Sequence, residues 1–438
     1  MWNFIKKQPP VRIIALGFLL TIFLGSVLLI MPFSVREGVK LGYIDSLYTS
    51  TSAVCVTGLV TVDVGATFTP IGQVILAVLM QVGGLGVATI GAGLMLAIGK
   101  KMNLKGMNII REASNLYSSG GLIRFVRDIF ITTVIIEAAG AILSFTVFIK
   151  DMPFWTALGV SLFHSIAAFN NSGFDILGGV EGFNSFESLI KYQNNALLNI
   201  STAAMIILGG IGFLVIRELM ANKFKWKKLS MHTKVVLSVN AALWIFGALL
   251  IKLTEKVSWL GAGFMSVSAR TAGFTTYQLS DFTNAGLLII CVLMFIGASS
   301  GSTGGGIKTT TFFTLLLGIR SSATNRSEKA FKYSMPKDAF RKAAVITLIA
   351  ILTVFTGTYL ISALEPTIPF RDVFFEMVSA FGTVGLSTGI TPNLCIGSKI
   401  VSMIIMYIGR LGPLTVASLW YFSRGDRFSY PEGNISIG

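Results

Sequence analysis

Charged residues are scarce in this 438-residue chain. Only 13% of its residues are Asp, Glu, Lys or Arg, while 53% are hydrophobic and the mean hydropathy is +0.75. A water-soluble domain carries roughly 25% charged residues, and its Lys, Glu, Arg and Asp side chains lie almost entirely on the surface. The composition therefore excludes a soluble globular protein and indicates a membrane protein.

Cysteine and histidine are also rare. The chain has three cysteines, Cys55, Cys291 and Cys395, and two histidines, His164 and His232. None of them has the spacing of a metal site or a disulfide framework. Paired carboxylates and a nucleophile placed beside a base are likewise missing from the pattern. We therefore expect no enzymatic activity and no cofactor in this chain.

Acidic residues are fewer than basic ones, 20 against 35, which gives a net charge of +15. The basic residues gather in alternate segments between apolar runs, and this positive-inside pattern predicts that both termini are cytoplasmic. Membrane topology explains most of the excess, so a nucleic-acid partner is not expected. The basic inner face also suits an acidic partner or anionic membrane lipid.

Eight apolar runs approach the length needed to cross about 30 Å of hydrocarbon. They lie at 13–33, 70–98, 128–149, 195–217, 234–252, 284–319, 343–364 and 399–422. The first run is not expected to be a cleaved signal peptide, because it is long, lacks a small-residue cleavage site and ends in Met31-Pro32.

A shorter apolar segment lies between the two runs of each successive pair. These segments are 45–53, 153–169, 258–268 and 369–381, and they begin near Asp45, Pro153, Ser258, and Pro369 with Asp372. Such residues are typical of helix starts. A ten-residue helix rises about 15 Å, which is half of the hydrocarbon thickness. The segments therefore predict four re-entrant pore helices that stop at mid-membrane.

A glycine motif follows each predicted pore helix. The copies are Cys55-Val56-Thr57-Gly58-Leu59, Asn170-Asn171-Ser172-Gly173-Phe174, Arg270-Thr271-Ala272-Gly273-Phe274 and Gly382-Thr383-Val384-Gly385-Leu386. Unpaired backbone at this depth is tolerated only inside the protein, along a wet path. We therefore expect the four motifs to converge on one axis.

The motifs have the composition of a carbonyl filter. None of them holds Asp or Glu, and glycine allows the backbone angles that aim carbonyl groups at a dehydrated cation. The candidate ion-binding residues are Val56, Thr57, Gly58, Asn171, Ser172, Gly173, Thr271, Ala272, Gly273, Thr383, Val384 and Gly385. Ordinary re-entrant turns in a protein without transport activity are the alternative, and the fourfold repetition argues against them.

The repeats divide the chain into four span–loop–span units. We assign them to 1–98 with a short cytoplasmic N-terminus, 99–217, 218–319 with a broken second span, and 320–438 with a short cytoplasmic C-terminus. The predicted fold is an all-α membrane protein with eight transmembrane helices and four re-entrant pore loops around a pseudo-fourfold pore.

The sixth apolar run is interrupted near its middle. Eight residues, Ser299-Ser300-Gly301-Ser302-Thr303-Gly304-Gly305-Gly306, cannot form a regular helix, since each glycine costs about 1 kcal/mol relative to alanine. Their backbone should line a cavity below the filter. We predict an intramembrane gate here, with a passive kink as the alternative. The candidate gate residues are Ser300, Gly301, Ser302, Thr303, Gly304, Gly305, Gly306, Lys308 and Arg410.

Several charged residues lie inside or beside the apolar runs. Arg410 should face the protein interior, where it would hinder cation flow or tether the broken run. Arg270 would brace a neighbouring loop, and Glu137 is assigned a structural role. The candidate partners of Glu137 are Arg124, Arg127 and Lys308. Outer acidic residues could concentrate cations or serve as helix caps; they are Asp45, Asp63, Asp175, Asp372 and Glu376.

The chain resembles the Trk/Ktr/HKT superfamily of potassium transporters. The resemblance covers nearly the whole chain and rests on the four motifs, the glycine-rich second runs, the GASSGSTGGGIK break and the Gly-Arg-Leu-Gly-Pro segment that begins at Gly409. The short N-terminus is most similar to that of bacterial Ktr membrane subunits (KtrB-type). One departure is Cys55, where threonine is common.

The resemblance implies potassium as the transported ion, since all four filter glycines are present. It implies a homodimer in a bacterial cell membrane, crossed several times by each protomer. It also implies a cytosolic RCK-type regulatory ring, similar to KtrA, that binds ATP or ADP and controls the gate. The alternatives are a sodium-permeable or sodium-coupled transporter of the same fold, and a membrane scaffold or sensor that binds a cation without flux.

Overall fold

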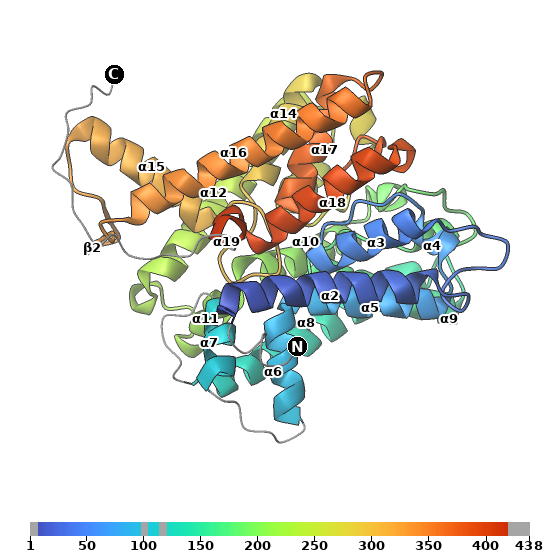
Figure 1. Ribbon diagram of the computed structural model, residues 1–438, viewed down its shortest axis with the longest axis horizontal. Helices are drawn as coiled ribbons and strands as arrows, with labels where there is room; N and C mark the ends of the chain where they lie inside the picture. The colour runs from blue at the N-terminus through green and yellow to red at the C-terminus, as the bar shows by residue number, and fades with distance from the viewer. Residues whose placement is uncertain (1–7, 98–103, 114–120, 419–438) are drawn as a thin grey trace.

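The computed structural model describes residues 8–97, 104–113 and 121–418, and these are predominantly helical. Figure 1 shows the helices packed side by side, with one small hairpin near α15. The hairpin consists of β1 (Lys329–Ala330) and β2 (Tyr333–Ser334), paired antiparallel.

Four helices are long and apolar enough to cross a membrane. They are α2 (Pro10–Ile30), α8 (Leu122–Phe148), α12 (Met231–Thr254) and α16 (Ala339–Leu364). Only 28–33% of each apolar window is buried inside the protein, so most of their Leu, Ile and Phe side chains face outward. Outward apolar side chains suit a helix whose surroundings are lipid.

Each of the four segments predicted to be a pore helix forms a short helix, and we keep the name pore helix for these four elements. They are α3 (Tyr43–Cys55), α9 (Phe154–Phe169), α13 (Trp259–Ser268) and α17 (Phe370–Gly382). Pro153, Ser258 and Pro369 are the residues before helix starts, as expected. The first helix begins two residues before its predicted segment, because Gly42 precedes the helix and Asp45 lies inside its first turn. A carboxylate in the first turn is favourable beside the helix dipole.

The helix after each pore helix is broken. The break in the sixth run, 284–319, was predicted from its interruption, whereas the other three breaks were not. These helices are α5 (Pro70–Leu85), α10 (Ala196–Ile211), α14 (Asn284–Phe295) and α18 (Ile396–Leu411). Breaks occur at Gly86, Gly212 and Gly412, with φ of 86°, 94° and 90°. Glycine adopts this left-handed backbone at little cost. Runs 70–98 and 195–217 therefore bend by 99° and 97° instead of continuing straight.

The segments beyond the breaks are α6 (Val87–Ala97), α11 (Phe213–Ala221), α15 (Thr309–Thr324) and α19 (Pro413–Ser418). The remaining elements are α4 (Val64–Thr67), α7 (Leu104–Ala113), η1 (Leu177–Gly179), η2 (Ile190–Tyr192), η3 (Trp226–Lys228), η4 (Leu279–Asp281) and η5 (Thr391–Asn393). Among the described residues, the helices that pass the length and hydropathy test number four, or six if each bent pair is one span.

The units pack in a closed cycle around the pore helices. Helix α5 packs on α9, α10 on α13, α14 on α17, and α18 on α3. The last contact includes a hydrogen bond of 3.0 Å between Tyr48 Oη and Ser402 Oγ, and an ion pair of 2.7 Å between Asp45 and Lys399. The C-terminal halves of the pore helices thus form the centre of the hydrophobic core.

Candidate functional site

The four motif glycines form a closed ring. Their φ values are 90° at Gly58, 69° at Gly173, 79° at Gly273 and 97° at Gly385. A Cβ built on each glycine would lie 3.0–3.2 Å from the Cα of the next, in the order 58, 173, 273, 385 and back to 58. Both the backbone angle and the crowding exclude a side chain at these positions. Chain segments at least 100 residues apart thus meet at one axis.

Backbone carbonyl oxygens lie between neighbouring glycines of this ring. The nearest atom to a Cβ built on each glycine is the carbonyl oxygen of the residue before the next glycine, at Thr57, Ser172, Ala272 and Val384. Several motif side chains have partners elsewhere: Ser172 Oγ donates to Met80 Sδ (2.8 Å), and Asn171 and Thr271 share a hydrogen bond of 3.0 Å. Thr57 Oγ1 is the exception, because it is buried and has no hydrogen-bond partner among the described residues. The ring therefore offers carbonyl oxygens from all four motifs and one free hydroxyl, from Thr57.

A second left-handed residue precedes each glycine by two positions. These residues are Val56, Asn171, Thr271 and Thr383, with φ of 57°, 56°, 80° and 49°. Positive φ is a genuine outlier for β-branched residues, and three of the four are β-branched. Strained backbone of this kind concentrates at functional sites. Its recurrence at one position of every motif indicates a built feature, although the motif sequences alone gave no sign of it.

Two serines that the sequence analysis missed hold the first and fourth motifs. Ser52 Oγ accepts from Gly58 N (3.0 Å), and Ser379 Oγ accepts from Gly385 N (3.1 Å). Both serines lie on the pore helix six residues before the glycine. The shared Ser-x5-Gly spacing was the available signal, but it occurs in only two of the four copies.

The break after α14 lies against the base of the ring. Gly305 N donates to Thr383 Oγ1 (3.0 Å), and a Cβ at Gly304 would overlap Thr271 Oγ1. On its other side, Thr303 N donates to Gly209 O (3.2 Å) at the end of α10. The loop is therefore bonded to both the motif segments and a neighbouring unit, with its backbone groups largely satisfied.

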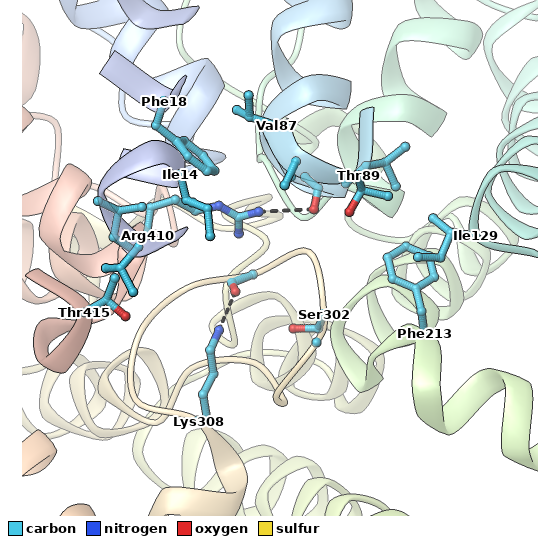
Figure 2. A pocket seen from close by; sticks show the side chains of 18 of the residues that line it. Ile14, Phe18, Val87, Thr89, Ile129, Phe213, Ser302, Lys308, Arg410 and Thr415 are labelled. Carbon is cyan, nitrogen blue, oxygen red and sulfur yellow. Dashed lines mark hydrogen bonds between the residues drawn. The ribbon is translucent and has the colours of Figure 1, made fainter. Parts of the chain in front are cut away.

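Lys308 and Arg410 hold this loop through carbonyl groups. Lys308 Nζ donates to Gly304 O at 2.6 Å, and Arg410 donates to the carbonyl oxygens of Thr303, Gly83 and Gly84, the last at 3.1 Å. Neither forms an ion pair within the described part of the chain. Figure 2 shows Lys308 bonded to the loop and Arg410 bonded to the bend after α5. The site consequently places two basic side chains next to the ring.

Both cations line a cavity of about 210 Å³ beside the loop. It is bounded by α2, the bend after α5, α8, α11, the loop and the end of α18, and its labelled lining residues appear in Figure 2. No carboxylate is among the lining residues. Such a cavity disfavours a resting cation by simple electrostatics.

The predicted contact of Arg270 is present in the described part of the chain, whereas the ion pairs considered for Glu137 are not. Arg270 is buried and donates to Ile296 O (3.3 Å) and Gly297 O (2.7 Å), so it braces the start of the broken segment as expected. None of the three candidate partners of Glu137 pairs with it in the described part of the chain. Its carboxylate accepts from Asn170 Nδ2 (3.2 Å) and is hydrogen-bonded to Gln81, and no ion pair to Arg124, Arg127 or Lys308 occurs among the described residues.

Most outer acidic residues serve as caps or ion-pair partners. Asp63 caps α4 and also accepts from Phe186 N (3.0 Å), and buried Glu376 accepts a hydrogen bond from Thr391. Asp175 differs because it follows Gly173 by two residues in the loop after the second motif. Burial, with a smaller effect of nearby Asp63, raises the pKa of Asp175 to about 7. Its charge therefore changes near neutral pH.

No cluster of three or more His, Cys, Asp or Glu side chains that could hold a metal ion occurs in the described ranges.

Comparisons with known proteins agree with this geometry. The family TrkH, described as cation transport protein, matches residues 14–244 and 232–423. The chain is 34% identical to the Ktr system potassium uptake protein B of Bacillus subtilis, covering 100% of this chain and 98% of that protein. It is 36% identical to the potassium/sodium uptake protein NtpJ of Enterococcus hirae, covering 99% and 98%. The solved potassium transporter TrkH of Vibrio parahaemolyticus shares the fold, with a TM-score of 0.72 at 17% identity over 95% of this chain and 86% of that one.

Proposed function

This chain belongs to the TrkH family of cation transport proteins, and from that premise we propose that it takes up potassium across a membrane. It is a multi-pass membrane transporter and not an enzyme. The observation that carries the proposal is the closed ring of Gly58, Gly173, Gly273 and Gly385, with carbonyl oxygens between neighbouring glycines. A dehydrated potassium ion needs such oxygens in place of its water shell.

The permeation path would follow the axis of this ring. In this proposal the units 1–98, 99–217, 218–319 and 320–438 each contribute two membrane crossings and one re-entrant pore helix around a pseudo-fourfold axis. The cyclic packing of each second helix on the next pore helix supports that layout. The twelve residues predicted for the filter, three from each motif, would then bind the ion in transit.

The loop from Ser300 to Gly306 would be the gate, with Lys308 and Arg410 as its fixed charges. Its support is the contact of Gly305 with Thr383 and the clasp of Arg410 on Thr303. Conduction would require the loop to leave the axis, since the loop lies against the base of the ring.

The regulated assembly would be a homodimer in a bacterial cell membrane with both termini in the cytoplasm. The relatives named for a Ktr system support a partner subunit, which we propose to be a cytosolic RCK-type ring that binds ATP or ADP. The basic segments between alternate apolar runs favour this orientation and an acidic partner.

A sodium-permeable or sodium-coupled transporter of the same fold is the second candidate. The printed name of the Enterococcus hirae relative joins potassium and sodium, and that observation alone favours it. Sodium current that persists without potassium would decide for this alternative.

Rubidium or potassium uptake by a transport-deficient bacterial cell tests the proposal. The chain should restore uptake, and co-expression of a cytosolic nucleotide-binding ring should increase it. If proteoliposomes that contain the purified chain and a functional ring take up no ions, the chain would instead be a membrane scaffold or sensor.

A further inference from the structure

The turn of the small hairpin has two residues that its backbone does not favour. Phe331 and Lys332, with φ of 49° and 71°, form the two-residue loop between β1 and β2, in which Ala330 pairs with Tyr333. A hairpin loop of this length with two positive φ values strongly prefers Asn-Gly. Phenylalanine and lysine oppose that preference, and strained residues of this kind concentrate where their side chains have a function.

The turn that follows α11 repeats this combination of residues. Lys223 and Phe224 have φ of 48° and 58°, and Phe224 N donates to Leu219 O (3.0 Å). Glycine or asparagine is the usual residue where a helix ends in a left-handed turn. An aromatic residue and a lysine therefore stand against the backbone preference at two turns more than 100 positions apart.

These two turns lie side by side in the fold. The rings of Trp226 and Phe331 are 6.3 Å apart between centroids and cross at 70°. We call residues 223–228 and 329–333 the aromatic–lysine patch, and Figure 1 shows its hairpin at the end of the molecule where α15 lies. The four aromatic side chains of the patch are exposed, from 36% at Phe331 to 73% at Phe224. Exposed aromatic side chains gathered in this way mark an interaction surface.

The charge of the patch has one sign. Its six lysines are exposed, and none of them forms an ion pair within the described part of the chain; they are Lys223, Lys225, Lys227, Lys228, Lys329 and Lys332. The patch contains no Asp or Glu, and Glu328 precedes its second segment directly. A surface of this composition attracts an anionic partner.

The patch lies next to the starts of two helices that are long and apolar enough to cross a membrane. Helix α12 begins three residues after Lys228, and α16 begins six residues after Tyr333. Aromatic rings at such helix ends lie among lipid headgroups, and long lysine side chains reach the phosphates. An interface with another protein is instead enriched in arginine and poor in lysine. The all-lysine composition therefore favours a lipid surface over a protein partner.

We propose that the aromatic–lysine patch binds the headgroups of anionic phospholipids. The lysine ammonium groups would contact the phosphates, and the aromatic rings would pack between the headgroups and the first part of the acyl chains. The left-handed turns hold Phe331 and Lys332 at the tip of the hairpin, beside Trp226. The site is separate from the glycine ring and does not depend on ion uptake.

Thermal unfolding of the purified full chain tests this site. Phosphatidylglycerol or phosphatidylcholine is added stepwise to the chain in a neutral detergent. The wild-type Tm should rise further with phosphatidylglycerol and then saturate, and high salt should reduce the difference between the two lipids. Lys225→Gln combined with Lys332→Gln should raise the half-saturating phosphatidylglycerol concentration at least about fivefold. Arg124→Gln combined with Arg127→Gln is the matched control, because it removes two exposed basic residues near the start of α8 and should leave that concentration unchanged.

A second variant separates lipid binding from the stability of the hairpin. Phe331→Asn combined with Lys332→Gly installs the turn that the backbone prefers, so the Tm without lipid should stay the same or rise. The same variant should weaken the response to phosphatidylglycerol, because it removes an aromatic ring and a lysine from the patch. A purely structural hairpin predicts an unchanged lipid response.

Equal wild-type responses to the two lipids, or a phosphatidylglycerol response kept in both patch variants, overturns the proposal. Patch variants that keep this response and lose binding of a cytosolic ring would assign the surface to a protein partner and would also overturn it. If the Asn-Gly variant does not fold, the lysine pair decides by the same criterion. Because no transport is measured, failure here leaves the proposed uptake function standing.

Discussion

Arg410, on α18, donates a hydrogen bond to the carbonyl oxygen of Thr303 in the broken segment that follows α14. The same guanidinium donates to Gly83 and Gly84 at the end of α5, so one side chain ties together three units. Its planar fork of five donors suits such a clasp better than a lysine ammonium would. Arg410 is therefore both a fixed charge beside the axis and a mechanical restraint on the loop.

Arg410→Ala should increase basal uptake. It removes three hydrogen bonds from a charged donor, each of about 1.5–3 kcal/mol, and about 1.4 kcal/mol already changes an equilibrium tenfold. We expect at least about a tenfold gain in rubidium uptake by cells without a regulatory ring. Arg410→Lys keeps the positive charge but loses the planar guanidinium group. It therefore separates the effect of the hydrogen bonds to the loop from the effect of the charge. Unaltered uptake in both variants would leave Arg410 without a role in gating.

Gly385→Ser should weaken the preference for potassium over sodium. Gly385 has φ of 97°, and a Cβ there would overlap Thr57 O and lie 3.0 Å from the Cα of Gly58. The ring must widen, and positive φ costs serine about 1–3 kcal/mol. We expect roughly a tenfold loss in the uptake ratio of the two ions. Gly389→Ser is a matched control, because Gly389 has φ of 98° but nothing within 4 Å. Equal ratios in the two variants would contradict the filter assignment.

Deletion of 304–306 should raise uptake in the absence of a regulatory ring. This segment contains Gly305, whose N–H is bonded to Thr383 at the base of the ring, and Gly304, which is packed against Thr271. Removing it clears the axis, provided that the helices still assemble. Rubidium uptake is the measurement, and an unchanged elution volume and Tm are the controls. A correctly folded deletion with lower uptake would refute the gate.

The pore helices were predictable because their limits depend on local signals. Pro153, Ser258 and Pro369 mark three helix starts, and a glycine motif follows each helix within a few residues. The bends at Gly86 and Gly212 escaped detection since hydropathy continues across them, and a run of apolar residues has the same pattern whether straight or folded by 97–99°. Only backbone conformation distinguishes these two glycines from those that merely allow close packing.

Contacts between distant segments account for the other differences. The hydrogen bond between Glu137 and Asn170 joins residues 33 positions apart. From the sequence, the candidate partners of Glu137 were arginine and lysine residues, because they carry the opposite charge. The left-handed angles at Val56 and Thr383 oppose the preferences of β-branched residues. These backbone angles occur where neighbouring units crowd each motif. The sequence of a single motif contains no information about that crowding.

Uptake at low external potassium should depend on the charge of Asp175. The pKa of this carboxyl is raised from 3.8 to about 7, first by burial and then by Asp63, so the group is largely neutral at pH 6 and ionised at pH 8. An ionised Asp175, two residues after Gly173, should concentrate cations at that end of the ring. Wild-type uptake should therefore rise between pH 6 and pH 8, by roughly threefold.

Asp175→Asn should remove this rise while keeping an acceptor for Leu177 N, which bonds to Asp175 Oδ1 at 3.1 Å. Asp63→Asn removes the charge that helps to raise the pKa of Asp175, so it should move the midpoint of the rise in uptake to lower pH.

The stability of the folded protein should also depend on the protonation of Asp175. Because the pKa of this carboxyl is higher in the folded protein than in the unfolded chain, the free energy of unfolding should fall as pH increases from about 4 to about 7. Asp175→Asn should flatten the dependence of Tm on pH over that interval. A wild-type pH profile of uptake retained in Asp175→Asn would assign the titration to another group.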